Sequence, residues 1–387
     1  MSSQPRLLPD ELSQRRAVTP LSRRALLAGA GAALAASPGP ARADALSTSA
    51  GLHDHALRSG RFYGAAIDQT ILATNPTYMA HVPVECGVVV SEAAFKWGRL
   101  RPAPELFYFA PADALMRYAE QHALALRGHT LVWHEDNPPW LAERLTSAAA
   151  AERLLTTHIR TVVRHFRGHV FQWDVVNEVL WLPDRQPLGL RDTLWLRALG
   201  PRYIDLAFHL CAETDPGAMR FINEFGLDYS WPDQQRKRAA MLSLLADLRH
   251  RGVPVQGLGM QAHLEAGVHA LDQKELAQFC ADVAALGLNI VITEMDVRDN
   301  RLPAAIPVRD AGVAAEGRAF LEVVLESPAL LGVVTWGLSD LRTWLDEAWP
   351  RTDGLPQRPL PLDREMRRKP LWEAMAATFD AALPLQK

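Results

Sequence analysis

The sequence predicts an α/β protein whose fold is a single (β/α)8 TIM barrel. Three observations predict it: eight short runs rich in β-branched and aromatic residues, longer helical patterns between them, and no glycine-rich phosphate turn after the first run. Alternating strands and helices imply a parallel sheet with helical crossovers, and an open doubly wound sheet would normally carry that turn. Eight such units in roughly 320 residues therefore favour a closed barrel.

The predicted strands follow one another from residue 61 onward and share apolar, strand-forming character. They are RFYGAAI from Arg61, CGVVVSE from Cys86, LRGHTLVW from Leu126, VFQWDVVNE from Val170, MRFINEF from Met219, VQGLGMQAH from Val255, NIVITEMDV from Asn289 and LGVVTWGLSD from Leu331.

Helical spacing is clearest in two of the segments between these strands. One apolar face is formed by Leu155, Ile159, Val162 and Phe166, and a second by Met241, Leu244, Leu245 and Leu248. The second helix is expected to stop at Arg251-Gly252, because basic residues in the last turn and a glycine beyond it are typical of helix ends. The proline-rich stretch 349–361 predicts an extended loop after the last strand.

The N-terminus has the pattern of an export signal. Ser22-Arg23-Arg24 precedes an uncharged run rich in Ala, Leu and Gly, which is followed by Ala41-Arg42-Ala43. Twin arginines, a short apolar region and an A-x-A site predict a twin-arginine signal peptide over residues 1–43. The apolar run is too short to span a bilayer, which needs about 20 residues. We therefore expect 44–387 to be one catalytic domain without a membrane anchor, periplasmic or secreted.

Composition and charge exclude several classes of protein. The chain is 48% hydrophobic and 22% charged with a net charge of −3, and cleavage would remove six arginines but only two acidic residues. An acidic mature chain makes nucleic acid an unsuitable partner. The three cysteines, Cys86, Cys211 and Cys280, lack CxxC spacing and allow at most one disulfide, so buried thiols are the favoured interpretation.

Polar and aromatic residues gather at the predicted strand ends, where barrel enzymes place their active sites. They are Glu92 with Lys96 and Trp97, His129 with Trp133 and His134, Asn177 and Glu178, Asn223, Gln261 and His263, Glu294 and Asp296, and Trp336 with Trp344. Carboxylates and amides suit sugar hydroxyls, and Trp faces suit the apolar side of a pyranose ring. This set therefore predicts a carbohydrate-binding cleft, with too few basic residues for phosphate.

Five of these segments, RGHTLVWH, WDVVNE, GMQAH, ITEMDV and TWG with a later Trp, resemble the signature blocks of glycoside hydrolase family 10. The blocks occur in order between Arg61 and Trp372. The resemblance implies a (β/α)8 barrel and a retaining endo-1,4-β-xylanase, with Glu178 as general acid/base and Glu294 as nucleophile. Such a reaction needs two carboxyl groups about 5–5.5 Å apart, and the ionised nucleophile would keep Glu178 protonated until the ester forms.

The resemblance also assigns the surrounding residues. His263 and Asp296 would support the nucleophile, and Asn177 would bind the 2-hydroxyl of the sugar whose bond is cleaved. The remaining substrate-binding residues would be Glu92, Lys96, His129, Trp133, Gln261, Trp336 and Trp344.

Three departures from the family pattern bear on the substrate and leave the reaction type unaffected. Ala93 stands where the family usually has an Asn that contacts the second glycone sugar, and Asp136 stands where a Gln often helps to exclude hydroxymethyl groups. After the fifth strand, Glu224-Phe225-Gly226 replaces the more usual Asp-Tyr-Asn. A missing amide contact costs about 1–2 kcal/mol of binding.

Two rivals to the xylanase follow from these features: a β-1,4-glucan or mixed-linkage hydrolase, and a barrel that binds carbohydrate without turnover. A metal site at His129, His134 and His263 is disfavoured because the three lack HExxH-type spacing. We expect no metal or organic cofactor, xylan or xylo-oligosaccharide as the partner, and a monomer.

Overall fold

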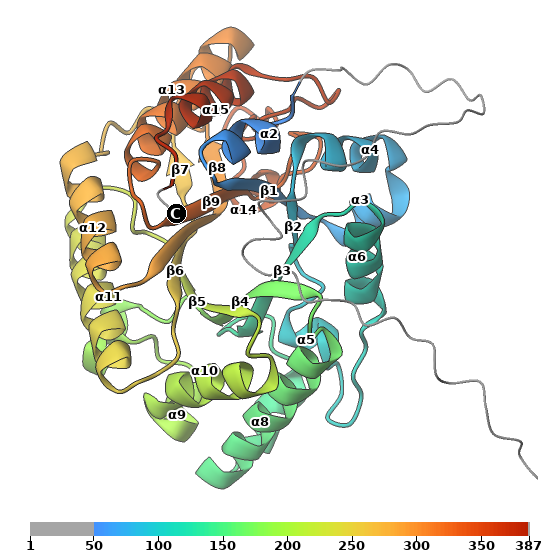
Figure 1. The fold of residues 1–387 in the computed structure, drawn as a ribbon, viewed down its shortest axis with the longest axis vertical. Coiled ribbons are helices and arrows are strands. Elements are labelled where there is room, and N and C mark those ends of the chain that lie inside the picture. The colour runs from blue at the N-terminus through green and yellow to red at the C-terminus, as the bar shows by residue number, and fades with distance from the viewer. Residues whose placement is uncertain (1–49, 386–387) are drawn as a thin grey trace, which may run out of the picture.

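The computed structural model describes residues 50–385, and they form a closed barrel of parallel strands (Figure 1). Its eight strands are β1 (Phe62–Ile67), β2 (Val88–Ser91), β3 (Ala125–Val132), β4 (Val170–Asn177), β5 (Met219–Glu224), β6 (Gly257–Met260), β8 (Asn289–Arg298) and β9 (Leu330–Thr335). Each pairs with the next along the chain, and β1 pairs with β9 from Phe62↔Gly332 to Ala65↔Thr335. The predicted TIM barrel and its eight strands are confirmed.

The sixth predicted strand is divided in two. A short strand β7 (His263–Glu265) follows β6 and pairs with the outer half of β8, with His263 opposite Asp296. The division occurs because Ala262 adopts a left-handed conformation, with φ of 62°, which no regular strand can contain. β8 continues beyond Glu294 to Arg298, one residue past the predicted run that begins at Asn289.

Helices surround the strands on the outside of the barrel (Figure 1). They are α2 (Leu52–Arg58), α3 (Gln69–Thr74), α4 (Pro76–Glu85), α5 (Trp97–Leu100), α6 (Ala110–Gln121), α7 (Pro139–Arg144), α8 (Ala148–His165), α9 (Leu194–Leu199), α10 (Arg202–Thr214), α11 (Pro232–His250), α12 (Gln273–Ala285), α13 (Ile306–Val324), α14 (Leu345–Ala348) and α15 (Pro370–Ala381). Short 3-10 turns, Leu182–Asp184 and Pro187–Gly189, lie in the loop after β4.

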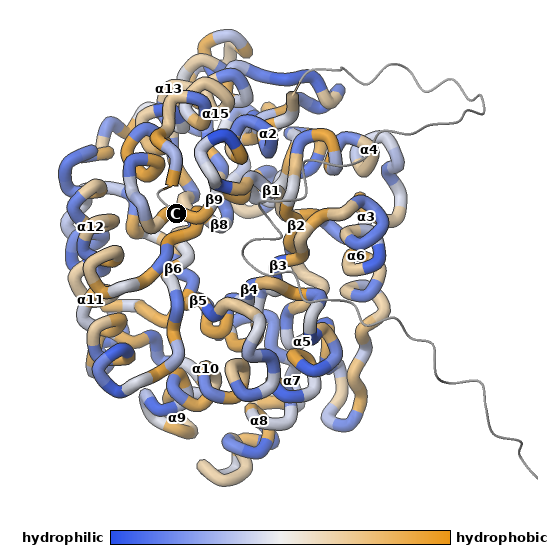
Figure 2. Tube along the Cα trace, viewed as in Figure 1, coloured by the Kyte–Doolittle hydropathy of each residue, from blue (hydrophilic) through white to orange (hydrophobic). Residues whose placement is uncertain are grey.

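The two helices predicted from apolar spacing are present. α8 buries Leu155, Ile159 and Val162 against the barrel and begins at Ser147, whose side chain accepts a hydrogen bond from the Ala150 N–H. α11 ends at His250, and Gly252 follows in the left-handed region with φ of 72°. Both colours of the hydropathy scale alternate along the outer helices, as expected of helices with one buried face (Figure 2).

Apolar residues fill the molecule on both sides of the strands. A small cluster, which includes Phe62, Val88, Val90 and Phe221, fills the inside of the barrel, and a larger one lies between the strands and the helices. The strands are buried on both faces, which is why they appear in the sequence as continuous apolar runs.

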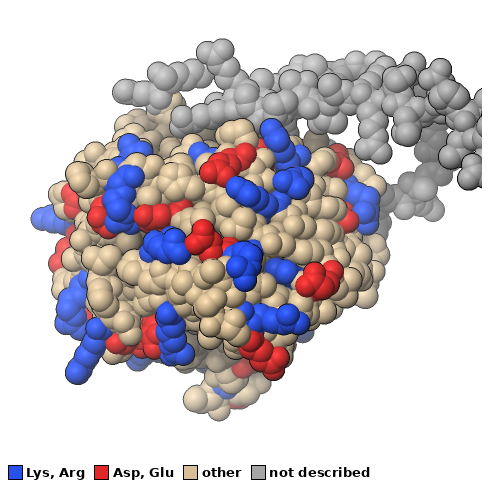
Figure 3. All heavy atoms as spheres, turned by 90° about the horizontal axis from the view of Figure 1, so that it is seen from below, with Lys and Arg blue, Asp and Glu red and all other residues tan. Residues whose placement is uncertain are grey.

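Several other predictions can be compared with the described residues. Cys86, Cys211 and Cys280 are free and buried, and the stretch 349–361 is a loop. No helix within residues 50–385 is long and apolar enough to cross a membrane. Lys and Arg are interspersed with Asp and Glu on the face shown in Figure 3. The predicted export signal, residues 1–43, lies outside the described residues.

Candidate active site

Glu178 and Glu294 lie at the C-terminal mouth of the barrel, on strands that are not neighbours. Glu178 directly follows β4 and adopts φ of 54°, and Glu294 lies within β8. Their side chains are 15% and 7% exposed, so both carboxylates are largely removed from water while remaining reachable. Charged side chains are rarely buried unless partners or a function compensate for the free-energy cost of desolvation.

Two residues, one in β5 and one directly after β6, connect the two glutamates. Gln261 Nε2 donates to Glu178 Oε1 at 3.1 Å, and the Gln261 carbonyl accepts the Glu294 N–H at 3.0 Å. Asn223 Nδ2 donates to Glu294 Oε1 at 2.7 Å, and the Asn223 carbonyl accepts the Glu178 N–H at 2.8 Å. The two carboxylates therefore share one rigid hydrogen-bonded frame.

Asn223 is the centre of this frame, although only its place on the fifth strand was noted from the sequence. It is fully buried at the end of β5, donates also to Asn177 Oδ1 at 2.8 Å and accepts from Thr293 Oγ1 at 2.7 Å. Its amide therefore has one fixed orientation. A lone Asn after an apolar strand carries no signal that distinguishes it from other polar residues at barrel mouths.

His263, from β7, supports Glu294. Its Nε2 lies 3.4 Å from Glu294 Oε2, and its Nδ1 lies 3.0 Å from Asp296 Oδ1. Burial alone would lower the pKa of His263, but Asp296 and Glu294 outweigh it and raise the pKa to about 10. The imidazole is therefore a cation at neutral pH.

Glu294 is correspondingly held as an anion. Burial would raise its pKa, but the interactions with His263 and His129 and the hydrogen bond from Asn223 lower the pKa to about 2. Trp344 completes the support, because its Nε1 donates to Asp296 Oδ2 at 2.8 Å.

A buried chain of polar groups positions His129. Its Nδ1 lies 2.9 Å from Asp174 Oδ2 and 3.9 Å from Glu294 Oε1, and Asp174 forms a bidentate pair with Arg127. The sequence did not point to Arg127 and Asp174. They lie inside apolar strands, where a single charged residue carries no sign of its role.

His134 and Arg191 accompany Glu178. His134 Nδ1 lies 3.7 Å from Glu178 Oε2, and Arg191 Nε donates to the Glu178 carbonyl at 2.9 Å. Burial and the charge of Arg191 lower the pKa of His134, which favours its neutral form.

The predicted glycone residues form a second group at the mouth. Lys96 Nζ lies 4.5 Å from the centroid of the Trp133 ring. Glu92 lies after β2, and burial together with the carboxylate of Asp68 raises its pKa to about 7, against the opposing charges of Arg342 and Lys96.

The tryptophans divide between the mouth and the core. Trp336 contacts His129 edge-on with centroids 5.3 Å apart, and Trp344 lies 5.0 Å from His263, so both adjoin the glutamates. Trp97 is buried and stacks on His158 at 3.5 Å, which makes it a core residue.

Histidines 129 and 263 both lie near Glu294, but His134 lies near Glu178 instead, so the three do not surround one point. Among residues 50–385, no three His, Cys, Asp or Glu side chains are arranged to hold a metal ion.

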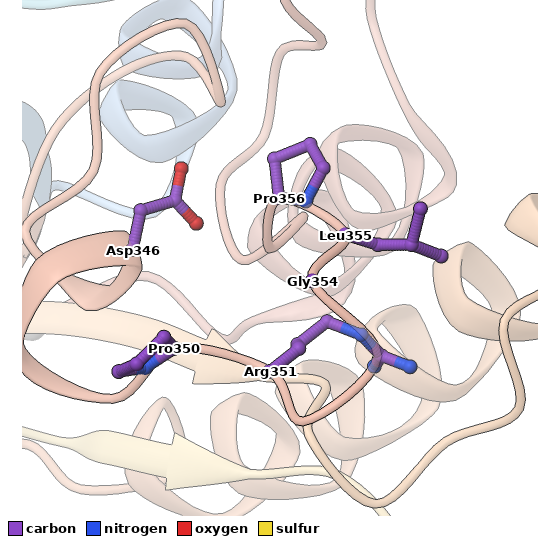
Figure 4. A pocket seen from close by; sticks show the side chains of 6 residues that line it. All are labelled: Asp346, Pro350, Arg351, Gly354, Leu355 and Pro356. Atoms are coloured by element: carbon purple, nitrogen blue, oxygen red, sulfur yellow. The ribbon is translucent and has the colours of Figure 1, made fainter.

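Two hollows on the molecule lie away from the glutamates. One of about 270 Å³ is formed by Asp346 of α14 and, in the loop that follows, by Pro350, Arg351, Gly354, Leu355 and Pro356 (Figure 4). Arg351 in this hollow forms ion pairs with Asp299 and Asp353, and these pairs stabilise the loop. The other, of about 640 Å³, lies between α3 and α6.

The closed barrel and the carboxylate pair at its mouth define the class of a glycoside hydrolase. Comparison with known proteins is consistent with this. The model of glycosyl hydrolase family 10 matches residues 51–378. The chain therefore belongs to glycosyl hydrolase family 10.

Individual relatives cover most of the chain. Endo-1,4-beta-xylanase B of Thermotoga neapolitana is 33% identical over 69% of this chain and 74% of its own length. Exoglucanase XynX of Acetivibrio thermocellus is 32% identical over 84% of this chain and 29% of its own length. The structure of xylanase 10B from Thermotoga petrophila RKU-1 in complex with xylobiose superposes with a TM-score of 0.78 at 27% identity, covering 87% of this chain and 99% of that one.

Proposed function

We propose that the protein is a retaining endo-1,4-β-xylanase that uses Glu294 as nucleophile and Glu178 as general acid/base. The observation that carries the proposal is the frame of Asn223 and Gln261, which joins two differently surrounded carboxylates across the mouth of the barrel. Relatives named as xylanases support the choice of substrate.

The two glutamates have different surroundings, and the proposed mechanism gives them different roles. Glu294 is kept ionised by His263 and Asn223, as attack on the anomeric carbon requires. Within the described residues, the Gln261 amide donates to one oxygen of Glu178, and the proposed role assigns to the other oxygen the proton that passes to the leaving oxygen. After the glycosyl ester forms, the same group would activate water.

The remaining predicted residues would bind the glycone sugars. Asn177 accepts from Asn223 through Oδ1, which leaves its Nδ2 group to donate to a 2-hydroxyl. Lys96 and Glu92 can bind hydroxyls, and Trp133 and Trp336 offer ring surfaces beside them.

The nucleophile variant tests this proposal. Glu294→Ala should reduce turnover of an aryl β-xylobioside to about one part in ten thousand or less, because the covalent step is lost. Azide should restore activity and yield an α-glycosyl azide, since it attacks from the vacated face. Glu178→Ala should instead lose less activity on aryl substrates with good leaving groups than on xylan. Normal activity in Glu294→Ala would refute the assignment.

A β-1,4-glucanase is the second candidate, and one structural observation favours it. The side chain of Asp136 lies 3.7 Å from Arg99, which commits it to an ion pair at the position where the family's Gln helps to exclude hydroxymethyl groups. Comparing kcat/KM on xylan, carboxymethylcellulose and lichenan decides between the candidates. A higher kcat/KM on either glucan than on xylan would identify the protein as a glucanase.

We also propose export by the twin-arginine route, supported by the Ser22-Arg23-Arg24 motif and the A-x-A site. Replacing Arg23 and Arg24 by Lys should trap the protein in the cytoplasm, as cell fractionation would show. Unchanged export would contradict this. We propose that the exported protein is a monomer, which its sedimentation velocity would test.

A further inference from the structure

We propose that Arg191 binds the carboxylate of a uronic acid side group on the leaving-group side of the cleaved bond, so that acidic, glucuronate-bearing xylan is a preferred substrate. The inference rests on the xylanase function proposed above and specifies its substrate class.

The position of Arg191 places it beside the leaving group. Its Nε donates to the carbonyl of Glu178, the residue that would protonate the leaving oxygen. Lys96, His129 and Trp336, assigned to the glycone, come from the ends of β2, β3 and β9, whereas Arg191 lies in the loop after β4, the same loop that begins with Glu178. The segment after β4, which carries Arg191, is therefore next to the sugar that departs.

Two aromatic rings hold the guanidinium in place. Its Cζ lies 4.9 Å from the centroid of Trp181 and 5.8 Å from that of Phe225, and the rings are 6.2 Å apart at 41°. Trp181 is 39% exposed. Exposed aromatic faces suit the apolar side of a sugar ring, and stacking orders the planar guanidinium beside them.

The charge of Arg191 is uncompensated, which distinguishes it from the other cation on the same ring. Lys237 Nζ lies 3.4 Å from the centroid of Phe225, but it is paired with Glu224 at 2.8 Å. Within the described part of the chain, no carboxylate forms an ion pair with Arg191, and the contacts given above are its side-chain interactions.

The unused donors of Arg191 match a carboxylate. An arginine has five N–H donors, of which the Nε–H is taken by Glu178, so the four on the Nη atoms remain for a ligand. Two parallel N–H groups suit a carboxylate in bidentate geometry, and unsubstituted xylan offers only neutral hydroxyls. A uronic acid side group on the xylan chain supplies a carboxylate that these N–H groups can bind.

The experiment compares one pair of substrates that differ only in charge: glucuronate-substituted xylo-oligosaccharides and the same oligosaccharides after reduction of the carboxyl to a hydroxymethyl group. We expect kcat/KM to be roughly three- to tenfold higher on the acidic form, the value of a partly exposed charged hydrogen bond. High salt should reduce this preference.

Variants assign the preference to Arg191. Arg191→Gln should remove it, and Arg191→Lys should retain part of it, because charge remains while the bidentate fork is lost. The control is Arg185→Gln, which removes an equal charge from an exposed site on the same loop and should leave the preference intact. Equal rates of the unaltered enzyme on both substrates would overturn the proposal, as would equal losses of preference in Arg191→Gln and Arg185→Gln.

Failure of the xylanase function has a different signature, namely no cleavage of either oligosaccharide. In that case, calorimetric binding of the same pair to the Glu294→Ala protein and to its combination with Arg191→Gln still tests Arg191. No loss of acidic preference in the combined variant would refute its role.

Discussion

At the scale of single residues, the two glutamates depend on neighbours that control their orientation and charge. Asn223 is fully buried and donates to Glu294 while Thr293 fixes its amide. Hydrogen bonds to a charged group contribute about 1.5–3 kcal/mol, more than those between neutral groups. The nucleophile should therefore respond to Asn223 more than to any neutral neighbour.

Replacing Asn223 by Ala should lower kcat/KM roughly tenfold or more, because the hydrogen bond to the Glu294 carboxylate is lost. Without that bond the pKa of Glu294 rises from about 2, so the acidic limb of the pH profile of kcat/KM should move to higher pH. The control, Thr293→Val, removes the bond to Asn223 Oδ1 but leaves the donor to Glu294. An acidic limb that stays in place in Asn223→Ala would contradict the role.

At the scale of elements, a buried ion pair joins β5 to α11. Glu224 ends β5, is fully buried and accepts from Lys237 of α11 at 2.8 Å and from the Leu180 N–H at 2.9 Å. It therefore ties a barrel strand, an outer helix and the loop after β4 together. Burial raises the pKa of Glu224, against the opposing charge of Lys237.

Lys237→Met should destabilise the protein by about 3–5 kcal/mol, because it leaves the carboxylate of Glu224 buried without its partner. Adding Glu224→Gln should recover part of this loss, since no charge then remains to be compensated. Urea unfolding of the single and double variants measures both effects. A double variant less stable than Lys237→Met would show that the pair does not act as a unit.

At the scale of the whole molecule, the fold was predictable and part of the site was not. Eight buried parallel strands leave continuous apolar runs, and the strand ends of a barrel converge on one mouth, so Glu178 and Glu294 could be located from the sequence. The break between β6 and β7 could not be predicted, because alanine is not a residue type that indicates a left-handed conformation such as that of Ala262. Arg127 and Asp174 were equally hidden, since their pairing joins positions far apart in the sequence.

The stability of the barrel should fall in acid partly because of His158. This residue of α8 is fully buried between the rings of Trp97 and Phe107, and neither ring nitrogen has a partner. Burial and the charge of Arg101 hold its pKa well below the usual 6.5. The unfolded chain therefore binds a proton near pH 6.5 that the folded chain excludes, so stability is lost as pH falls below that value.

His158→Phe keeps the stack on Trp97 and abolishes this proton uptake. Its stability relative to the unaltered protein should not depend on pH above about 7 and should increase by up to about 1.4 kcal/mol per pH unit below 6.5. Urea unfolding between pH 4.5 and pH 8 measures the difference, with His250→Gln, at an exposed site, as the control for removal of a histidine. Because buried carboxyls such as Asp340, whose pKa burial raises to about 6, act in the opposite direction, only the difference between variants isolates the histidine. A pH-independent difference would mean that His158 becomes protonated in the folded protein as readily as in the unfolded chain.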